Sequence, residues 1–288
     1  MSNTTMPIHL RIDHVTIAGP ELAPLEQAFA DMGLTTDYGG PHSNKITHMA
    51  LLGLVDGSYI ELISSVVEGG QEAHAFWGEH IAAGGGPCAW AVRADDVAAE
   101  AARVAALGIR AEGPVYYSRR RPDHAVVEWD MAFLGDLGAG AILPFIIKDI
   151  TPREVRVKPS ASVADGLLTR VNTVILAVDT LQPAIELFQR LYHWPAPQLK
   201  DDVAFGARLA AFQDTPVVLA APLAGQPWLS ERLARFGPSP CTFLIGAANF
   251  EAAVERYKLV EERAWFDRRL AWFDPARMGG YRLGVVGF

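Results

Sequence analysis

The chain has 288 residues, of which 50% are hydrophobic and 20% charged, and its formal net charge at pH 7 is −8. Such a chain can bury a sizeable core, and its length favours two domains over one. The acidic balance argues against nucleic acid and against an anionic membrane as partners, because neither attracts an acidic surface.

Cysteine usage and the N-terminus point to a cytoplasmic protein. Cys88 and Cys241 lie far apart and in no CxxC pair, so buried thiols are expected rather than a disulfide framework. The N-terminus, MSNTTMPIHL, has neither the basic start nor the apolar run of a signal peptide. The longest apolar run, AGAILPFII (139–147), is too short to span a bilayer.

Four stretches of the chain repeat one order of elements, a strand, a helix and then further strands. RIDHVTIA (11–18) opens the first stretch and RVNTVILA (170–177) opens a close copy of it. PCAWAVR (87–93) and PCTFLIG (240–246) open two weaker copies. The repeats predict four βαβββ units, at about 10–65, 87–148, 168–222 and 240–288.

The segments between these units predict the domain boundaries. Residues 65–86 join the first two units and are expected to hold a short helix. Residues 149–166, DITPREVRVKPSASVADG, are rich in Pro, Ser and charge, as inter-domain linkers are. We therefore expect a domain at 8–150, a linker at 151–167 and a second domain at 168–288.

Ordered motifs in the first domain resemble the vicinal oxygen chelate superfamily, and within it the glyoxalase-like branch. These motifs are Asp13-His14, Thr47-His48, Tyr59-Ile60-Glu61-Leu62-Ile63, Arg119-Arg120-Arg121-Pro122-Asp123, Trp129 and Leu143-Pro144-Phe145. The resemblance implies an α+β fold, with paired βαβββ units forming two domains of mixed, mostly antiparallel, curved sheets with flanking helices. It covers roughly residues 10–148, and the second domain matches in architecture alone.

The resemblance also implies a metal site on the concave face of the first sheet. His14 and Glu61 match two metal positions of the superfamily, and two imidazoles with one carboxylate suit Fe(II), Zn, Mn or Ni. His48 is the candidate for the third ligand, or else a substrate contact or the ion-pair partner of Glu61. The superfamily's other two ligands would fall near Ala89 or Trp90 and near Pro144 or Phe145, none of which binds metal.

A second group of residues predicts a binding place for an anion. In SRRRPDHAVVEW (118–129), Arg119 and Arg121 share one face of a strand, and a guanidinium binds a carboxylate or phosphate through two hydrogen bonds. A solvated run of charges at a sheet edge is the alternative. Trp129 and Tyr59 are expected to line the pocket, although Trp129 could also belong to the core.

The second domain carries no comparable group. Asn172 or Thr173 stands at the position that corresponds to His14. The position that corresponds to Glu61 lies close to Leu219, and the one that corresponds to His48 lies near Gly206. This domain could serve as a lid over the first, as a dimerisation surface or as a separate apolar pocket.

Three functions follow from these observations. The first is a metal-dependent glyoxalase-like enzyme for a small, oxygen-rich, anionic substrate, with Glu61 and His48 catalytic and with isomerase, lyase or ring-cleaving dioxygenase chemistry. The second is a metal-free binding or resistance protein of the bleomycin-resistance type. The third is an oligomeric interaction scaffold. A small molecule is the expected partner and a homodimer stays open, with nucleic acid and membranes excluded.

Overall fold

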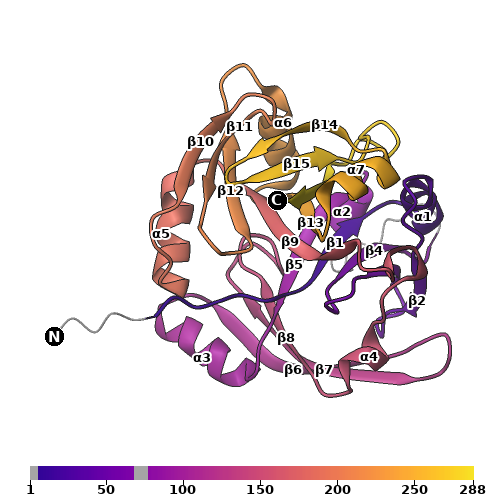
Figure 1. Cartoon of the computed structure of the whole chain (residues 1–288). Coiled ribbons are helices and arrows are strands. Elements are labelled where there is room, and N and C mark those ends of the chain that lie inside the picture. Colours follow the sequence, from indigo (N-terminus) through magenta and orange to yellow (C-terminus); the bar gives the residue numbers. More distant parts are fainter. Residues whose placement is uncertain (1–5, 68–76) are drawn as a thin grey trace.

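The computed structural model describes residues 6–67 and 77–288 and contains the four expected units (Figure 1). The first unit has β1 (Ile12–Ala18), α1 (Leu22–Asp31), β2 (Asp37–Pro41), β3 (Thr47–Gly53) and β4 (Tyr59–Ser65). The second has β5 (Gly86–Arg93), α3 (Val97–Ala106), β6 (Ala111–Arg120), β7 (Val126–Leu134) and β8 (Phe145–Asp149). Between them lies the short helix α2 (Gly78–Ala82), as expected for this segment.

The second half of the chain repeats the pattern. Its elements are β9 (Leu168–Ala177), α5 (Leu181–Tyr192), β10 (Gln198–Asp202), β11 (Ala207–Ala211), β12 (Val217–Pro222), α6 (Pro227–Phe236), β13 (Ser239–Ala247), α7 (Phe250–Tyr257), β14 (Val260–Trp265), β15 (Arg268–Trp272) and β16 (Leu283–Gly287). The connecting segment holds α4 (Arg153–Arg156) and a 3₁₀ turn, Ala161–Val163.

Each half builds one mixed sheet of eight strands. The orders are β2-β3-β4-β1-β5-β8-β7-β6 and β10-β11-β12-β9-β13-β16-β15-β14, so the two sheets have the same topology. β1 pairs with β4 in parallel and with β5 in antiparallel fashion, and β9 does the same with β12 and β13. This is the α+β architecture that the repeats predicted.

Strand alternation divides each sheet into a helix-covered face and a concave face. On β1, Val15 and Ile17 pack into the main hydrophobic cluster, whereas His14 faces the other way into a cavity. On α3 the apolar stripe of Val97, Ala101 and Val104 is buried. The side chain of Asp96 accepts a hydrogen bond from Ala99 N, so Asp96 caps the N-terminus of this helix.

The two sheets meet through their central strands. β1 contacts β9 and β5 contacts β13, and in Figure 1 these strands run through the middle of the molecule. One hydrophobic cluster contains residues of both halves, among them Val15, Val92, Val174 and Ile245. The proposed division at 8–150, 151–167 and 168–288 stays a prediction, because this shared core spans both sheets.

The connecting segment packs against the first sheet. Ser160 N donates to Gly53 O at 2.9 Å, and Gly53 N donates to Ser160 Oγ at 3.0 Å. A Cβ on Gly53 would lie 2.0 Å from Lys158 O, so only glycine allows this approach. The contact holds α4 against the cavity described below.

Candidate functional site

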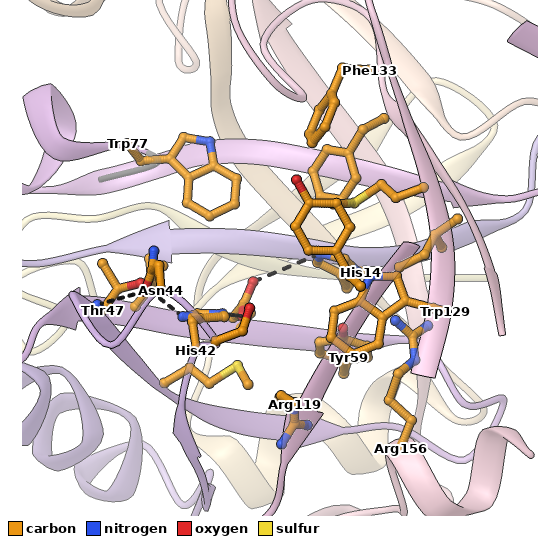
Figure 2. A pocket seen from close by; sticks show the side chains of 18 residues that line it. His14, His42, Asn44, Thr47, Tyr59, Trp77, Arg119, Trp129, Phe133 and Arg156 are labelled. Atoms are coloured by element: carbon orange, nitrogen blue, oxygen red, sulfur yellow. Dashed lines mark hydrogen bonds and ion pairs between the residues drawn. The ribbon is translucent and has the colours of Figure 1, made fainter. Parts of the chain in front are cut away.

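The concave face of the first sheet encloses a cavity of about 120 Å³. Aromatic and apolar side chains from β6, β7, β8 and the start of α2 form most of its wall, and Figure 2 shows several of them around the opening. They are Trp77, Tyr117, Trp129, Met131, Phe133, Phe145 and Ile147. Polar side chains complete the lining, namely His14, His42, Ser43, Asn44, Thr47, Glu61, Arg119 and Arg156.

Glu61 is the centre of the polar side. Its side chain is 6% exposed, and Oε1 lies 3.2 Å from His42 Nε2. Thr16 Oγ1 donates to Oε2 at 3.2 Å, and His14 Nε2 lies 3.8 Å from the same oxygen. The cavity therefore contains a buried carboxylate flanked by two imidazoles.

Glu61 stays ionised in spite of its burial. Burial alone would raise its pKa, but the hydrogen bond and charge of His42, followed by the charge of His14, outweigh it and lower the pKa to about 2. A low pKa for a carboxyl inside an apolar cavity is unusual, because charge is normally costly there. The two imidazoles are the reason that the charge is kept.

His14 is fixed from behind by Asp13. His14 Nδ1 lies 2.7 Å from Asp13 Oδ1, and the His14 ring stacks on Tyr59 with the ring centroids 4.6 Å apart. A carboxylate on Nδ1 holds a proton there and directs Nε2 toward Glu61. Burial raises the pKa of Tyr59, so that side chain stays a phenol.

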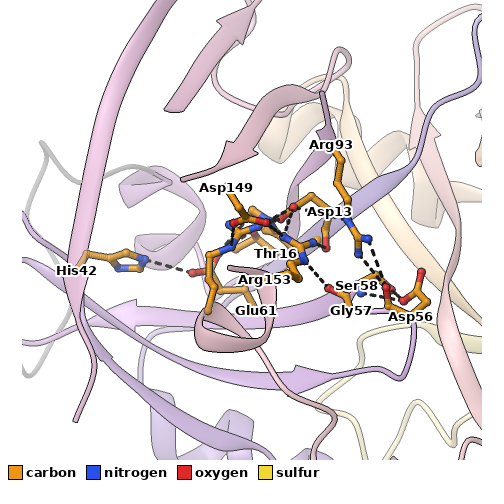
Figure 3. Close-up of polar contacts among 12 residues, drawn as sticks. Asp13, Thr16, His42, Asp56, Gly57, Ser58, Glu61, Arg93, Asp149 and Arg153 are labelled. Atoms are coloured by element: carbon orange, nitrogen blue, oxygen red, sulfur yellow. Dashed lines mark hydrogen bonds and ion pairs between the residues drawn. The ribbon is translucent and has the colours of Figure 1, made fainter. Parts of the chain in front are cut away.

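Asp13 is itself held by arginines of the connecting segment (Figure 3). Arg156 Nη2 donates to both carboxylate oxygens, at 2.8 and 2.6 Å, and Arg153 Nη1 donates to Oδ2 at 2.5 Å. Burial would raise the pKa of Asp13, but Arg156 and the hydrogen bond to His14 hold it well below the usual range. The connecting segment thus reaches the cavity through Asp13 and His14.

Arg119 brings a buried cation to the same cavity. Its side chain extends from β6, and Nη1 donates to Gly39 O on β2 at 2.6 Å, which joins the two edge strands of the sheet. Burial lowers the pKa of Arg119 from its usual value, with Tyr59 and Glu61 opposing that shift. Among the described residues Arg119 forms no ion pair, so its remaining donors can meet an anionic ligand.

Five of the seven residues chosen from the sequence line this cavity. They are His14, Tyr59, Glu61, Arg119 and Trp129. The other two lie elsewhere, since His48 Nε2 is bonded to Ser64 Oγ at 2.9 Å and packs on Tyr38, and Arg121 pairs with Asp123 at 2.9 Å and donates to Val155 O. The structure does not bring either residue into the group around Glu61.

His42, Arg156 and Trp77 are site residues that the sequence did not reveal. His42 lies between β2 and β3, and a tight turn holds it inward, with Nδ1 2.9 Å from Thr47 Oγ1. Asn44 Oδ1 stabilises this turn by accepting from Ile46 N at 2.9 Å. His74 lies outside the described residues.

The residues facing Glu61 do not fit the expected metal centre. Glu61 pairs with Thr16 on β1 as Phe145 pairs with Ala91 on β5, so Phe145 stands at the position equivalent to Glu61. Ala89 pairs with Thr16 as His14 pairs with Ala91, so Ala89 stands at the position equivalent to His14. A phenyl and an alkyl side chain therefore stand where the superfamily's other two ligands would be. Within residues 6–67 and 77–288 no set of three His, Cys, Asp or Glu side chains is arranged to hold a metal. We derive no chemical step through a metal here.

His42 and His48 provide a matched pair of substitutions. Replacing His42 with Ala removes a hydrogen-bond partner of a buried carboxylate and should lower the free energy of unfolding by about 1–3 kcal/mol. Replacing the half-buried His48 with Ala should cost less than about 1 kcal/mol, because the Ser64 hydroxyl can also donate to Ser65 O. Urea unfolding of both variants measures the difference, and a larger loss for His48→Ala would contradict this assignment.

Comparison with known proteins supports the same fold. A family model described as a glyoxalase-like domain matches residues 12–192. No curated protein matches the chain. No helix of the described residues is long and apolar enough to cross a membrane.

Solved structures resemble the chain at low sequence identity. A hypothetical protein from Staphylococcus aureus matches with a TM-score of 0.64 and 13% identity, over 97% of this chain and 100% of its own. A mutant 4-hydroxymandelate synthase from Streptomyces coelicolor matches with a TM-score of 0.61 and 11% identity, over 98% and 93%. Methylmalonyl-CoA epimerase from Mycobacterium tuberculosis has a TM-score of 0.37 and 22% identity, over 42% and 89%. The two full-length likenesses show the fold. The family model covers more than half of the chain, so the chain belongs to the glyoxalase-like domain family.

Proposed function

We propose that the chain is an enzyme that moves a proton on a small organic anion bound in the first cavity. The observation that carries this proposal is one buried, ionised carboxylate, Glu61, which lies between two imidazoles and faces an apolar cavity. Because Glu61 is ionised, it can accept a proton from a substrate as a general base, and an adjacent imidazolium can return one. The reaction class is isomerase or lyase chemistry.

The residues that line the cavity indicate what kind of substrate it could bind. Aromatic side chains such as Trp129 and Phe133 suit a flat or branched apolar body, and Arg119 suits a carboxylate at one end. A carbonyl next to the carboxylate would make a neighbouring C–H acidic enough for Glu61 to act on. Small 2-oxo acids with an apolar side chain combine these features.

The catalytic roles differ from those expected from the sequence. Glu61 keeps its role as the acid–base group, whereas His42 takes the place proposed for His48. His14 supplies the second imidazole beside Glu61, and Asp13 positions that imidazole through its contact with Nδ1. Ring-cleaving dioxygenation would need the metal that these residues do not fit, so it is not part of this proposal.

Arg119→Met tests how the substrate is held, and Arg121→Met is its control. We expect binding of phenylpyruvate to quench the fluorescence of Trp77 and Trp129, which line the cavity. Losing a charge-assisted hydrogen bond should weaken binding in Arg119→Met by about tenfold or more, whereas Arg121→Met should bind like the wild type. Equal weakening in both variants would contradict the role of Arg119.

A further inference from the structure

A second cleft lies in the second sheet, where the sequence showed no catalytic group. It has a volume of about 450 Å³, and half of the residues that line it are polar or charged and half are apolar or aromatic. They include Asn172, Thr173, Gln198, Gln213, Asp214, Thr215, Val218, Trp265, Asp267, Arg268 and Val286. Neither the family match nor the first cavity gives this cleft a role.

Strand register shows that this cleft is built on positions equivalent to those of the first cavity. Thr16 pairs with Glu61 in the first sheet, and Ile175 pairs with Val218 in the second. Cys88 donates a hydrogen bond to Thr16 O, and Cys241 donates one to Ile175 O, so Thr16 and Ile175 are equivalent positions. Their strand partners are then equivalent too, and Val218 occupies the position of Glu61. The sequence comparison had pointed to a residue near Leu219.

Strand register also shows which other residues of the two cavities occupy equivalent positions. Tyr117 pairs with Trp129 in the first sheet, and Trp265 pairs with Arg268 in the second. Asp13 and His14 correspond to Asn172 and Thr173 in the aligned first strands. The two cavities thus share their framework, and their chemistry differs residue by residue.

The second cleft lacks the groups for proton transfer. Thr173 replaces His14, and Val218 replaces Glu61, so no imidazole or carboxylate stands at those two positions. The other end of this concave face is filled by apolar residues, including the fully buried Phe205 and Leu229. The cleft is therefore suited to binding and not to the chemistry proposed for the first cavity.

Arg268 in the second cleft is hydrogen-bonded to a neutral amide, whereas Arg156 in the first site is paired with a carboxylate. In the first sheet the carboxylate of Asp13 neutralises Arg156. In the second, Arg268 Nη1 donates to the amide oxygen of Asn172 at 2.9 Å, and Thr173 Oγ1 donates to the same oxygen. An amide accepts a hydrogen bond without cancelling the charge, so Arg268 keeps a positive potential inside the cleft.

The carboxylates nearby do not remove that potential. Asp267 Oδ1 lies 3.9 Å from Arg268 Nε, but the Asp267 side chain is 79% exposed, so water screens the pair. Asp214 is exposed in the turn after β11. These two charges at the rim disfavour a doubly charged phosphate ester more than a singly charged carboxylate.

We infer that the second cleft is a binding site for a small hydroxylated carboxylate. Arg268 would bind the carboxylate through its guanidinium, and Thr173, Thr215 and Gln198 would provide hydrogen bonds to hydroxyl groups. The inference is independent of the function proposed for the first cavity. It assigns the second half of the chain a ligand site of its own.

Gluconate and sorbitol form a matched pair of probes, because they share a six-carbon polyol skeleton and differ in the carboxylate. We expect saturation-transfer NMR and calorimetry to detect gluconate binding to the full chain, with sorbitol at least about tenfold weaker. Glu61→Gln should leave gluconate binding unchanged, which separates this site from the first cavity. Absence of gluconate binding, equal binding of sorbitol, or tighter binding of glycerol 3-phosphate would overturn the inference.

Two substitutions locate the site on Arg268. Arg268→Gln should weaken gluconate binding at least about tenfold, whereas Arg208→Gln, at an exposed arginine paired with Asp201, should have no effect. Asn172→Asp is nearly isosteric and keeps Arg268, but its charge neutralises the guanidinium as Asp13 neutralises Arg156. We expect the same tenfold loss in Asn172→Asp, and wild-type affinity in this variant would overturn the inference.

Discussion

Replacing Asp13 with Asn is expected to lower the free energy of unfolding by about 3–5 kcal/mol. Asp13 is fully buried, and it receives hydrogen bonds from Arg156 and Arg153 as well as the contact with His14. Asn cannot neutralise these cations, and removing one partner of a buried ion pair leaves the other charge uncompensated. Urea unfolding and a fall in Tm of the order of 10 °C would measure the effect.

Asp149→Asn is the control for this prediction. Asp149 also contacts Arg153 and Arg156, but its side chain is 20% exposed and water reaches it. Its loss should therefore cost clearly less than the loss of Asp13. If Asp13→Asn cost no more than Asp149→Asn, the account of the connecting segment as a support for His14 would be wrong.

Acid should destabilise the protein through Glu61. Its folded pKa of about 2 lies below the ordinary value of 4.5, so the ionised carboxylate stabilises the folded state above about pH 4.5. That contribution is lost as the pH falls from about 4.5 through 2, because the unfolded chain binds the proton first. The difference between these two pKa values corresponds to about 3 kcal/mol.

Glu61→Gln isolates this contribution. The variant should be less stable than the wild type at pH 6, and its free energy of unfolding should fall less steeply between pH 5 and 2. Glu112→Gln, at an exposed carboxylate paired with Arg110, should follow the wild-type curve. Parallel curves for Glu61→Gln and the wild type would contradict the low pKa of Glu61.

Much of the fold and half of the site follow from local sequence patterns. The repeated strand and helix signals gave the four units, and alternation along β1 and β4 placed His14 and Glu61 on one face. Both residues lie near the centres of adjacent paired strands, where strand geometry fixes the direction of a side chain. Strand alternation gave each side chain its direction, and the resemblance to the superfamily implied that the two residues meet at one site.

His48 could not be placed without the register between two strands. Leu51 pairs with Glu61, and His48 is three residues from Leu51, so the two side chains point to opposite faces of β3. The sequence contains both strands but not the pairing between them. Met49, at even spacing from Leu51, lines the cavity instead.

His42 and Arg156 depend on contacts that are distant along the chain. His42 reaches Glu61 through a turn closed by Asn44 and Thr47, and Arg156 reaches Asp13 across 143 residues. No periodic pattern marks such contacts, because they arise from how a loop and a connecting segment pack on a finished sheet. These residues complete the site, and only the structure identifies them.

Solvent-exchange NMR tests the central claim that Glu61 moves a proton on a bound organic anion. Wild-type protein, treated with EDTA, would be incubated in D₂O with phenylpyruvate and with 4-methyl-2-oxopentanoate. We predict deuterium incorporation next to the carbonyl of at least one of them well above the uncatalysed rate, and its loss in Glu61→Gln, which should still bind the compound. Exchange equal to the uncatalysed rate, exchange that Glu61→Gln retains, or exchange that appears only after a divalent metal is added would contradict the account.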